Sequence, residues 1–108
     1  MLINITNDSW FGRSAGPYQH ALLNSMRAIE NRVAIARSAT SGQSLFIDQF
    51  GRRYQMSEIF TEAALVGNVS VAQSGSFYSR NGDLFAYCCL LFSAFCLIVL
   101  RMRNRANL

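Results

Sequence analysis

Few side chains in this sequence could do covalent chemistry, and their spacing favours no catalytic arrangement. The chain has one histidine, His20, so a Ser-His-Asp triad would have to combine it with Asp8 and one of several serines. Nothing in the spacing favours that triad over a structural histidine that forms hydrogen bonds. The sequence also contains no glycine-rich phosphate-binding loop. Residue chemistry taken alone therefore predicts no active site.

The cysteines Cys88, Cys89 and Cys96 lie in an apolar run that carries no charge. A cysteine nucleophile needs a polar, partly exposed setting, which this run does not offer. The thiols show no C-x-x-C spacing and have no histidine nearby, so neither a zinc site nor a disulfide is expected. We predict that they behave as small apolar side chains, and that the chain holds no metal and no cofactor.

The composition is typical of a compact or membrane-attached protein. Hydrophobic residues make up 51% of the chain and charged residues 15%, which argues against disorder. All 10 basic residues are arginine. Because Arg101, Arg103 and Arg105 crowd the C-terminus and the others are scattered, the net charge of +4 does not indicate a nucleic-acid-binding surface.

The apolar run Leu84–Leu100 predicts a helix that spans a membrane. It carries no charge between Asp83 and Arg101, and at a rise of about 1.5 Å per residue it covers about 26 Å, enough for the hydrocarbon core of a bilayer. A buried core helix is the alternative, but so small a domain could not surround a helix that is apolar on every face. We therefore expect a transmembrane helix over residues 84–101.

The arginines after this helix predict its orientation. By the positive-inside rule the basic tail at 102–108 stays in the cytoplasm, and residues 1–83 lie on the outer side, which is the periplasm in a bacterial cell. The first residues do not resemble a signal peptide, because no basic segment is followed by an apolar one. We expect that earlier membrane helices are missing from this chain.

The pattern before the membrane helix indicates an α/β layer fold. Alternation in Leu2–Thr6 predicts a strand that runs into a loop, and Pro17 suits the first turn of a helix over Pro17–Asn31. Further strands are predicted at Val33–Ser38, Ser44–Ile47, Arg52–Met56 after a turn at 48–51, and Ala64–Val71.

The predicted helix has one apolar and one polar stripe. Its apolar residues recur at helical spacing at Leu22, Met26, Ile29 and Val33. Its polar stripe, which we interpret as facing solvent, consists of His20, Asn24, Arg27 and Asn31.

The loop Asn7–Gly12 is the most unusual local feature, because it places two aromatic and several short polar side chains at the end of a strand. Ligands commonly bind at strand ends in α/β folds. The alternative is that Trp10 and Phe11 pack the loop onto the core, and composition alone favours that alternative.

At these residues the chain resembles the C-terminal part of bacterial apolipoprotein N-acyltransferases, membrane enzymes with a nitrilase-like (carbon-nitrogen hydrolase) domain. The matching blocks are Asn4–Gly12 as N-x-x-N-D-x-W-F-G, Ser14, Gly16-Pro17, Gln19-His20, Arg27–Glu30, Arg37 with Gly42, Ile47-Asp48 with Gly51, and Tyr78–Asp83 as Y-x-R-x-G-D. One departure is Thr40, where the family usually has asparagine, so a loop hydrogen bond there is expected to differ.

The resemblance implies a division of the chain. Residues 1–73 would form the C-terminal part of a nitrilase-like α-β-β-α sandwich, 74–83 a juxtamembrane segment, 84–101 the transmembrane helix and 102–108 the cytoplasmic basic tail. It also implies location in the bacterial cytoplasmic (inner) membrane, with the domain on the periplasmic side.

The resemblance further implies acyl transfer by a Glu-Lys-Cys triad. In such enzymes the cysteine takes a fatty acyl group from a phospholipid as a thioester, the glutamate is the general base and the lysine stabilises the oxyanion. The N-terminal diacylglyceryl-cysteine of an apolipoprotein then receives the acyl group. The implied partners are the phospholipid donor, the apolipoprotein acceptor, membrane lipid and a missing N-terminal half, with no nucleic acid.

None of the three catalytic residues can be assigned in this chain. In family order all three precede the Asn-Asp-x-Trp-Phe-Gly block, and the sequence has no lysine and no cysteine outside the apolar run. Glu30, Glu58 and Glu62 fall where the family does not place its base. We therefore expect a C-terminal fragment, produced by truncation, a frameshift or a gene split, that is inactive alone.

The same comparison predicts site residues, because the loop follows the expected nucleophile strand. Those expected to shape the acyl-thioester pocket are Trp10, Phe11, His20 and Arg37. Those expected to hold the loop are Asn7, Asp8 and Gly12. Two alternatives remain open: a non-catalytic membrane-anchored remnant or binding module, and a fragment of a soluble amidase or nitrilase, against which the membrane helix argues.

Overall fold

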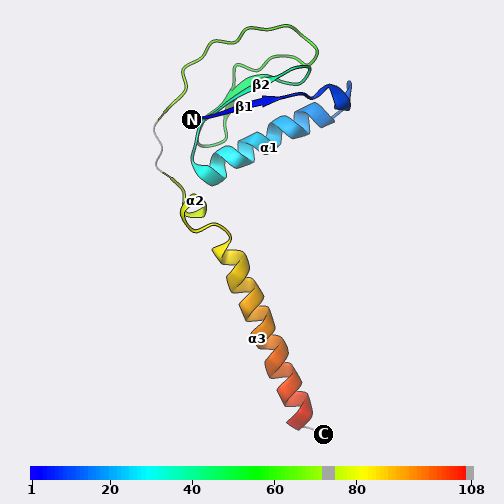
Figure 1. Cartoon of the computed structure of the whole chain (residues 1–108), viewed down its shortest axis with the longest axis vertical. Helices are drawn as coiled ribbons and strands as arrows, with labels where there is room; N and C mark the ends of the chain where they lie inside the picture. Colours follow the sequence, from blue (N-terminus) through cyan, green and yellow to red (C-terminus); the bar gives the residue numbers. More distant parts are fainter. Residues whose placement is uncertain (72–74, 107–108) are drawn as a thin grey trace.

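The computed structural model describes residues 1–71 and 75–106. Its elements are β1 (Leu2–Thr6), the 3-10 helix η1 (Ser9–Phe11), α1 (Gly16–Asn31), β2 (Ile35–Ala39), β3 (Leu45–Ile47), β4 (Arg53–Tyr54), α2 (Phe77–Asn81) and α3 (Leu84–Ala106). Figure 1 shows a small α/β domain from which α3 extends. The predicted boundary between residues 73 and 74 and the last two residues of the predicted tail lie outside the described residues.

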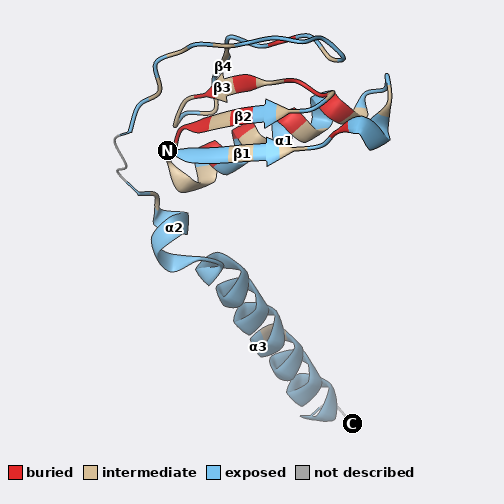
Figure 2. Cartoon of the chain, turned by 45° about the horizontal axis from the view of Figure 1, so that its top comes forward, coloured by how far each residue is buried: buried red, intermediate tan, exposed pale blue. Residues whose placement is uncertain are grey.

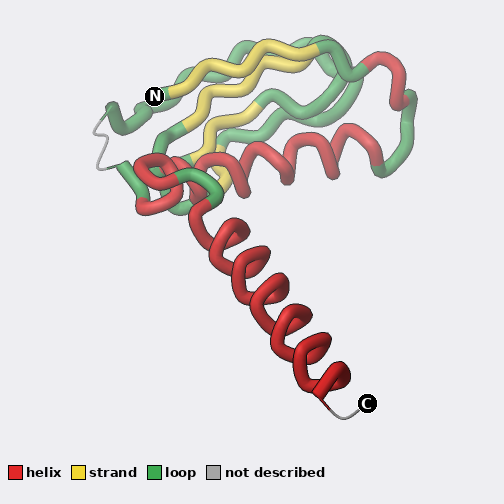
Figure 3. The backbone as a smooth tube through the Cα atoms, turned by 60° about the horizontal axis from the view of Figure 1, so that its bottom comes forward, coloured by secondary structure: helices red, strands yellow, loops and turns green. Residues whose placement is uncertain are grey.

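A single four-stranded sheet, in the order β1-β2-β3-β4, forms the centre of the domain. β1 and β2 run parallel and are connected through α1, whereas β3 and β4 each pair antiparallel with the strand before them. α1 packs along one face of this sheet (Figure 3). The α/β class is therefore confirmed. The described residues contain one sheet layer, so the α-β-β-α arrangement stays a prediction.

The core lies between α1 and the sheet, and small side chains form the buried side of the helix. Ala21 and Ala28 are fully buried, and Ser25 lies on the same side. They meet large side chains of the sheet, of which Ile35 and Ile47 are at most 1% exposed. Small residues on the helix let its backbone come close to the strands, which keeps the contact densely packed.

The predicted apolar stripe of α1 does not form this contact. Leu22, Met26 and Ile29 are 50%, 55% and 43% exposed, whereas the alanines beside them are buried. The stripe of large residues lies next to the stripe of small ones around the helix, and helical periodicity alone does not tell which of the two faces the sheet. The pattern therefore predicts the helix correctly and does not predict its rotation.

The β3–β4 hairpin is closed by the carboxylate of Asp48. It accepts hydrogen bonds from the backbone N–H groups of Phe50 and Arg52, both at 2.9 Å, and from Nε of Arg52 at 2.7 Å. Partial burial raises the pKa of this carboxyl, but the hydrogen bonds and the Arg52 charge outweigh that effect and hold the pKa below its usual 3.8. The strand that follows is Arg53–Tyr54, shorter than the predicted Arg52–Met56.

The predicted last strand at Ala64–Val71 is wrong, because the structure has no strand there. The segment crosses the sheet face that α1 leaves open: Leu65 contributes to a pocket on that face, and the backbone of Gly67 packs against the Phe46 ring. A ladder needs backbone groups in the plane of the sheet, and a segment that lies over its face cannot supply them. Residues 64–70 alternate between exposed and half-buried, as residues of a surface strand do. This alternation explains why the sequence pattern predicted a strand here.

α2 follows the sheet in the chain, lies against the C-terminal end of α1, and leads into α3. The hydroxyl of Ser76, which caps α2, also hydrogen-bonds the backbone carbonyl of Glu30 at the end of α1. The 23 residues of α3 form a helix that is long and apolar enough to cross a membrane, and none of its span is buried in the protein. Figure 2 shows α3 exposed along nearly all of its length, with one half-buried position near its middle. The helix continues to Ala106, beyond the predicted end of the span at residue 101.

Candidate functional site

A buried ion pair between Asp8 and Arg37 lies at the centre of the candidate site. Asp8 follows β1 by two residues, and Arg37 lies in the middle of β2, which is parallel to β1. Nη2 of Arg37 donates to Oδ2 of Asp8 over 2.6 Å, and both side chains are fully buried. Two charges removed from water in this way are stable only when their remaining polar atoms are also paired.

The other guanidinium nitrogens of Arg37 are paired. Nη1 donates to Oδ1 of Asn4 over 3.1 Å, and Nε donates to the backbone carbonyl of Gln43 over 3.2 Å. Asn4 is the register partner of Arg37 on β1, whereas Gln43 lies in the turn before β3. Arg37 therefore connects β1, the loop after it and the β2–β3 turn.

His20 on α1 completes this polar cluster, which consists of Asn4, Asp8, His20, Arg37 and Gln43. Nδ1 of His20 lies 2.8 Å from Oδ1 of Asp8, and because a carboxylate only accepts, the Nδ1–H donates. The His20 side chain is 38% exposed, so it borders solvent and at the same time forms the hydrogen bond expected of a structural histidine. Within residues 1–71 and 75–106, no serine hydroxyl is hydrogen-bonded to His20, so the pair is not part of a Ser-His-Asp triad.

Gly42 lets the β2–β3 turn approach Asp8. A Cβ at this position would lie 2.0 Å from Oδ2 of Asp8, which is inside any real contact distance. Thr40, where the family usually has asparagine, lies two residues before Gly42. Its backbone N–H donates to the carbonyl of Thr6 over 3.1 Å, which holds the turn to the end of β1. The turn thus lies directly against the carboxylate.

The loop after β1 presents its two aromatic residues differently. The Phe11 ring packs edge-on against His20, with ring centroids 5.8 Å apart, and covers the backbone of Gly16 at the start of α1. Trp10 is 87% exposed. Asn7 stabilises the turn by accepting a hydrogen bond from the Ser9 N–H over 3.1 Å. Phe11 therefore packs onto the start of α1 while remaining 43% exposed, whereas Trp10 is almost fully exposed to solvent.

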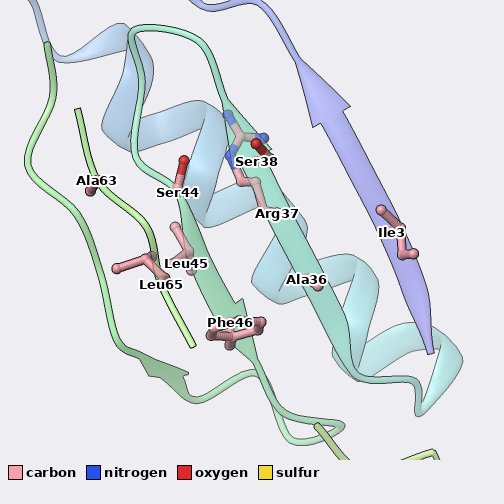
Figure 4. Close-up of a pocket in the computed structure, with 9 residues that line it drawn as sticks. All are labelled: Ile3, Ala36, Arg37, Ser38, Ser44, Leu45, Phe46, Ala63 and Leu65. Carbon is pink, nitrogen blue, oxygen red and sulfur yellow. The ribbon is translucent and has the colours of Figure 1, made fainter. Parts of the chain in front are cut away.

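A pocket of about 200 Å³ lies on the sheet face opposite α1. Figure 4 shows it between the strands and the crossing segment, lined by Ile3, Ala36, Arg37, Ser38, Ser44, Leu45, Phe46, Ala63 and Leu65. Its lining is mainly apolar and contains no histidine, cysteine or carboxylate. It could hold apolar groups, but no basic side chain of the lining could activate the hydroxyls of Ser38 and Ser44 as nucleophiles, because its one charged residue is an arginine.

The structure brings three of the four predicted pocket residues, Phe11, His20 and Arg37, to the surroundings of Asp8. Trp10, the fourth, is 87% exposed. Of the four, only Arg37 also borders the pocket on the other face. Gly12 is at a φ of +55°, a backbone conformation that favours glycine, and so fits a role in the loop. That these residues shape a substrate pocket stays a prediction.

Two members of the cluster, Asn4 and Gln43, and Gly42 beside it were not singled out from the sequence as site residues. Asn4 and Gly42 both lie in the blocks that resemble the acyltransferases, so pairing β1 with β2 in register could have brought them to Arg37. Gln43 contributes its backbone carbonyl, which no side-chain pattern reveals.

The chain is similar in sequence to known apolipoprotein N-acyltransferases. The chain is 47% identical over 94 residues to an apolipoprotein N-acyltransferase of Geobacter metallireducens, a match that covers 87% of this chain and 18% of that protein. It is 38% identical over 101 residues to the apolipoprotein N-acyltransferase of Chlorobaculum tepidum, covering 94% of this chain and 19% of that protein. The chain thus spans about a fifth of the length of the curated relatives it matches.

The family comparison covers the whole α/β domain. The Carbon-nitrogen hydrolase profile matches residues 1–78, which include every strand, α1 and all members of the polar cluster. Because this profile matches most of the chain, and because the acyltransferases above are 38% and 47% identical to it, the chain belongs to the carbon-nitrogen hydrolase family.

Proposed function

We propose that this chain serves as the C-terminal portion of an apolipoprotein N-acyltransferase. That enzyme would transfer a fatty acyl group from a phospholipid to the N-terminal diacylglyceryl-cysteine of an apolipoprotein. The observation that carries the proposal is the joint match of the domain and the apolar helix: the Chlorobaculum tepidum relative aligns over 94% of the chain, more than the family domain alone would cover.

The proposal assigns the covalent chemistry to residues outside these 108. The sequence has no lysine, and its cysteines lie in α3, so a Glu-Lys-Cys triad has to come from another part of the enzyme. Residues 1–73 would complete a nitrilase-like sandwich, and the open sheet face with the exposed Ile3 and Ile5 would pack against the rest of it. The chain alone would then be inactive.

The proposal places α3 across the inner membrane. Residues 74–83 would be the juxtamembrane segment, 84–101 the span and 102–108 a tail on the cytoplasmic side, with the domain in the periplasm. The length, apolar character and exposure of α3 support a membrane span, and Arg101, Arg103 and Arg105 support the orientation.

Within this enzyme, the loop after β1 would border the acyl-thioester pocket. Trp10 and Phe11 would supply apolar surface for the acyl chain, and Trp10 is free to do so because it has little contact with its own domain. His20 and Arg37 would act through Asp8 by holding the loop in place. Asn7 and Gly12 would set the turns of that loop.

A chimaera tests the function directly. In the Geobacter metallireducens enzyme, the stretch that matches this chain would be replaced by residues 1–108, and acylation of a diacylglyceryl peptide would be measured in membranes. We expect the chimaera to retain activity and the 108-residue chain alone to have none. A matched chimaera with Trp10→Ala should keep its membrane content and lose acylation rate.

Two results would contradict the proposal. One is a chimaera that accumulates in the membrane at normal levels but does not acylate, which would favour a non-catalytic remnant. The other is acyl transfer by the isolated chain, which would place catalytic groups within it. Unchanged acylation by the Trp10→Ala chimaera would remove Trp10 from the pocket.

A further inference from the structure

The C-terminal end of α3 carries a charged surface that the proposed acyl transfer does not use. Arg101 and Arg105 lie one helical turn apart and, with Ile98 and Met102, line a hollow of about 250 Å³. Ile98 and Met102 are 58% and 67% exposed, so their side chains are open to the surroundings. Within residues 1–71 and 75–106, no ion pair involves the arginines of this surface.

Helical geometry separates Arg103 from this surface. At about 100° per residue, Arg105 is rotated about 40° from Arg101, whereas Arg103 lies about 160° away on the other side of the helix. Arg103 does not line the hollow. Arg101 and Arg105 therefore lie on one surface of the helix. Arg103 carries the same charge at a similar height along the helix but on another side, so it serves as a control.

We propose that Arg101 and Arg105, with Ile98 and Met102, form a binding site for one anionic phospholipid. The inference rests on the proposed membrane span, because only then does this end of α3 lie at the level of lipid headgroups. It is independent of acyl transfer.

The chemistry of the four side chains fits a phospholipid better than other anions. Guanidinium groups donate two parallel hydrogen bonds to phosphate oxygens, and a pair of them offers a fork on either side of one phosphate. Ile98 and Met102 lie on the same surface and provide the apolar contact that an acyl chain makes and a soluble anion does not. An anionic headgroup would balance positive charge that no carboxylate of the described residues neutralises.

The test compares three single substitutions in the full chain, Arg101→Gln, Arg105→Gln and Arg103→Gln. Each chain would be reconstituted in vesicles of phosphatidylcholine with a smaller share of phosphatidylglycerol, and the lipid retained after extraction would be identified by native mass spectrometry. We expect phosphatidylglycerol to be enriched on the unsubstituted chain. Arg101→Gln and Arg105→Gln should each reduce that enrichment about fivefold, and Arg103→Gln should leave it nearly unchanged.

The outcomes separate the site from its alternatives. Equal losses for all three variants would overturn the proposal in favour of diffuse attraction between charge and membrane. Enrichment that inorganic phosphate abolishes, when chloride of equal ionic strength does not, would assign the site to a soluble anion and overturn it as well. A chain that alkaline washing removes from the vesicles would refute the membrane span, whereas a retained chain without enrichment would refute only this site.

Discussion

Asp8 and Arg37 form the kind of contact in which a single side chain decides whether a loop keeps its shape. Both are fully buried, and the hydrogen bonds from Arg37 to Asn4 and Gln43 pair the nitrogens that the carboxylate leaves free. The ion pair between Arg27 and Glu30 differs, because its side chains are 67% and 38% exposed and water competes for both charges. We therefore expect very different costs when each pair is broken.

Arg37→Met should destabilise the domain by about 3–5 kcal/mol, because it leaves the Asp8 carboxylate buried without its partner. Arg27→Met, the matched control on the surface, should cost at most about 1 kcal/mol. Urea unfolding of the detergent-solubilised chain, followed by circular dichroism, measures both. If Arg37→Met does not fold, Arg37→Lys should still show an intermediate loss, since a lysine cannot reach all three acceptors. Equal costs for Arg37→Met and Arg27→Met would contradict the role of the buried pair.

Asp48 makes the hairpin sensitive to acid. Because its pKa is lowered in the folded chain, its contribution to stability is complete above the unfolded value of about 3.8 and is lost as the pH falls through the lower folded value. Carbon-13 NMR of the Asp48 carboxyl should show a midpoint below 3.8. Arg52→Gln removes the guanidinium bond and should move the midpoint upward. A midpoint that Arg52→Gln does not change would show that the backbone N–H groups alone stabilise the charge.

At the scale of the element, the rotation of α1 sets the shape of the site. The alanine face lets the helix approach the sheet closely, and the same rotation brings His20 over Asp8. The larger apolar residues Leu22 and Met26 are then turned away from the sheet. Periodicity marks both faces equally well, so the choice between them comes from packing against the strands.

Substitutions on the two faces of α1 test this rotation. Ala21→Leu should destabilise the domain by about 1–3 kcal/mol, because the larger side chain has no space between helix and sheet. Met26→Ala should change the free energy of unfolding by no more than about 0.5 kcal/mol, since its side chain is 55% exposed. Denaturant titration of both variants compares them. The reverse order of costs would show that the predicted apolar stripe is the buried one.

At the scale of the whole molecule, the chain consists of a small domain and a helix that stands apart from it. The molecule extends 71 Å along its longest axis, and α3 accounts for the part that leaves the domain (Figure 1). A hydrogen bond from the Ser76 hydroxyl to the Glu30 carbonyl fastens the start of this C-terminal part to α1. An isolated apolar helix of this length is stable where lipid surrounds it.

The orientation proposed for α3 is tested by thiol labelling. In the chimaera, every cysteine would be replaced by alanine, which includes Cys88, Cys89, Cys96 and the nucleophile contributed by the rest of the enzyme. A single cysteine would then be placed by Asn81→Cys or by Asn104→Cys. A membrane-impermeant maleimide added to intact cells should label the first variant, and the second only after the membrane is permeabilised. The opposite pattern of labelling would reverse the orientation.

The local elements could be predicted from the amino-acid sequence. Alternation located β1, the Pro17 turn and helical spacing located α1, and the uncharged run located α3, because torsion preferences and periodicity are properties of neighbouring residues. The ordered blocks around the Asn7–Gly12 loop also indicated the family that the comparisons confirm.

The way in which these elements meet depends on tertiary packing. That packing joined Asp8 to Arg37 across two strands, turned the alanine face of α1 toward the sheet, and carried Ala64–Val71 over the sheet face without strand pairing. The physical reason is that burial and pairing depend on residues distant in the chain. A side chain's own neighbours in sequence therefore do not reveal which carboxylate it will meet or which face it will cover.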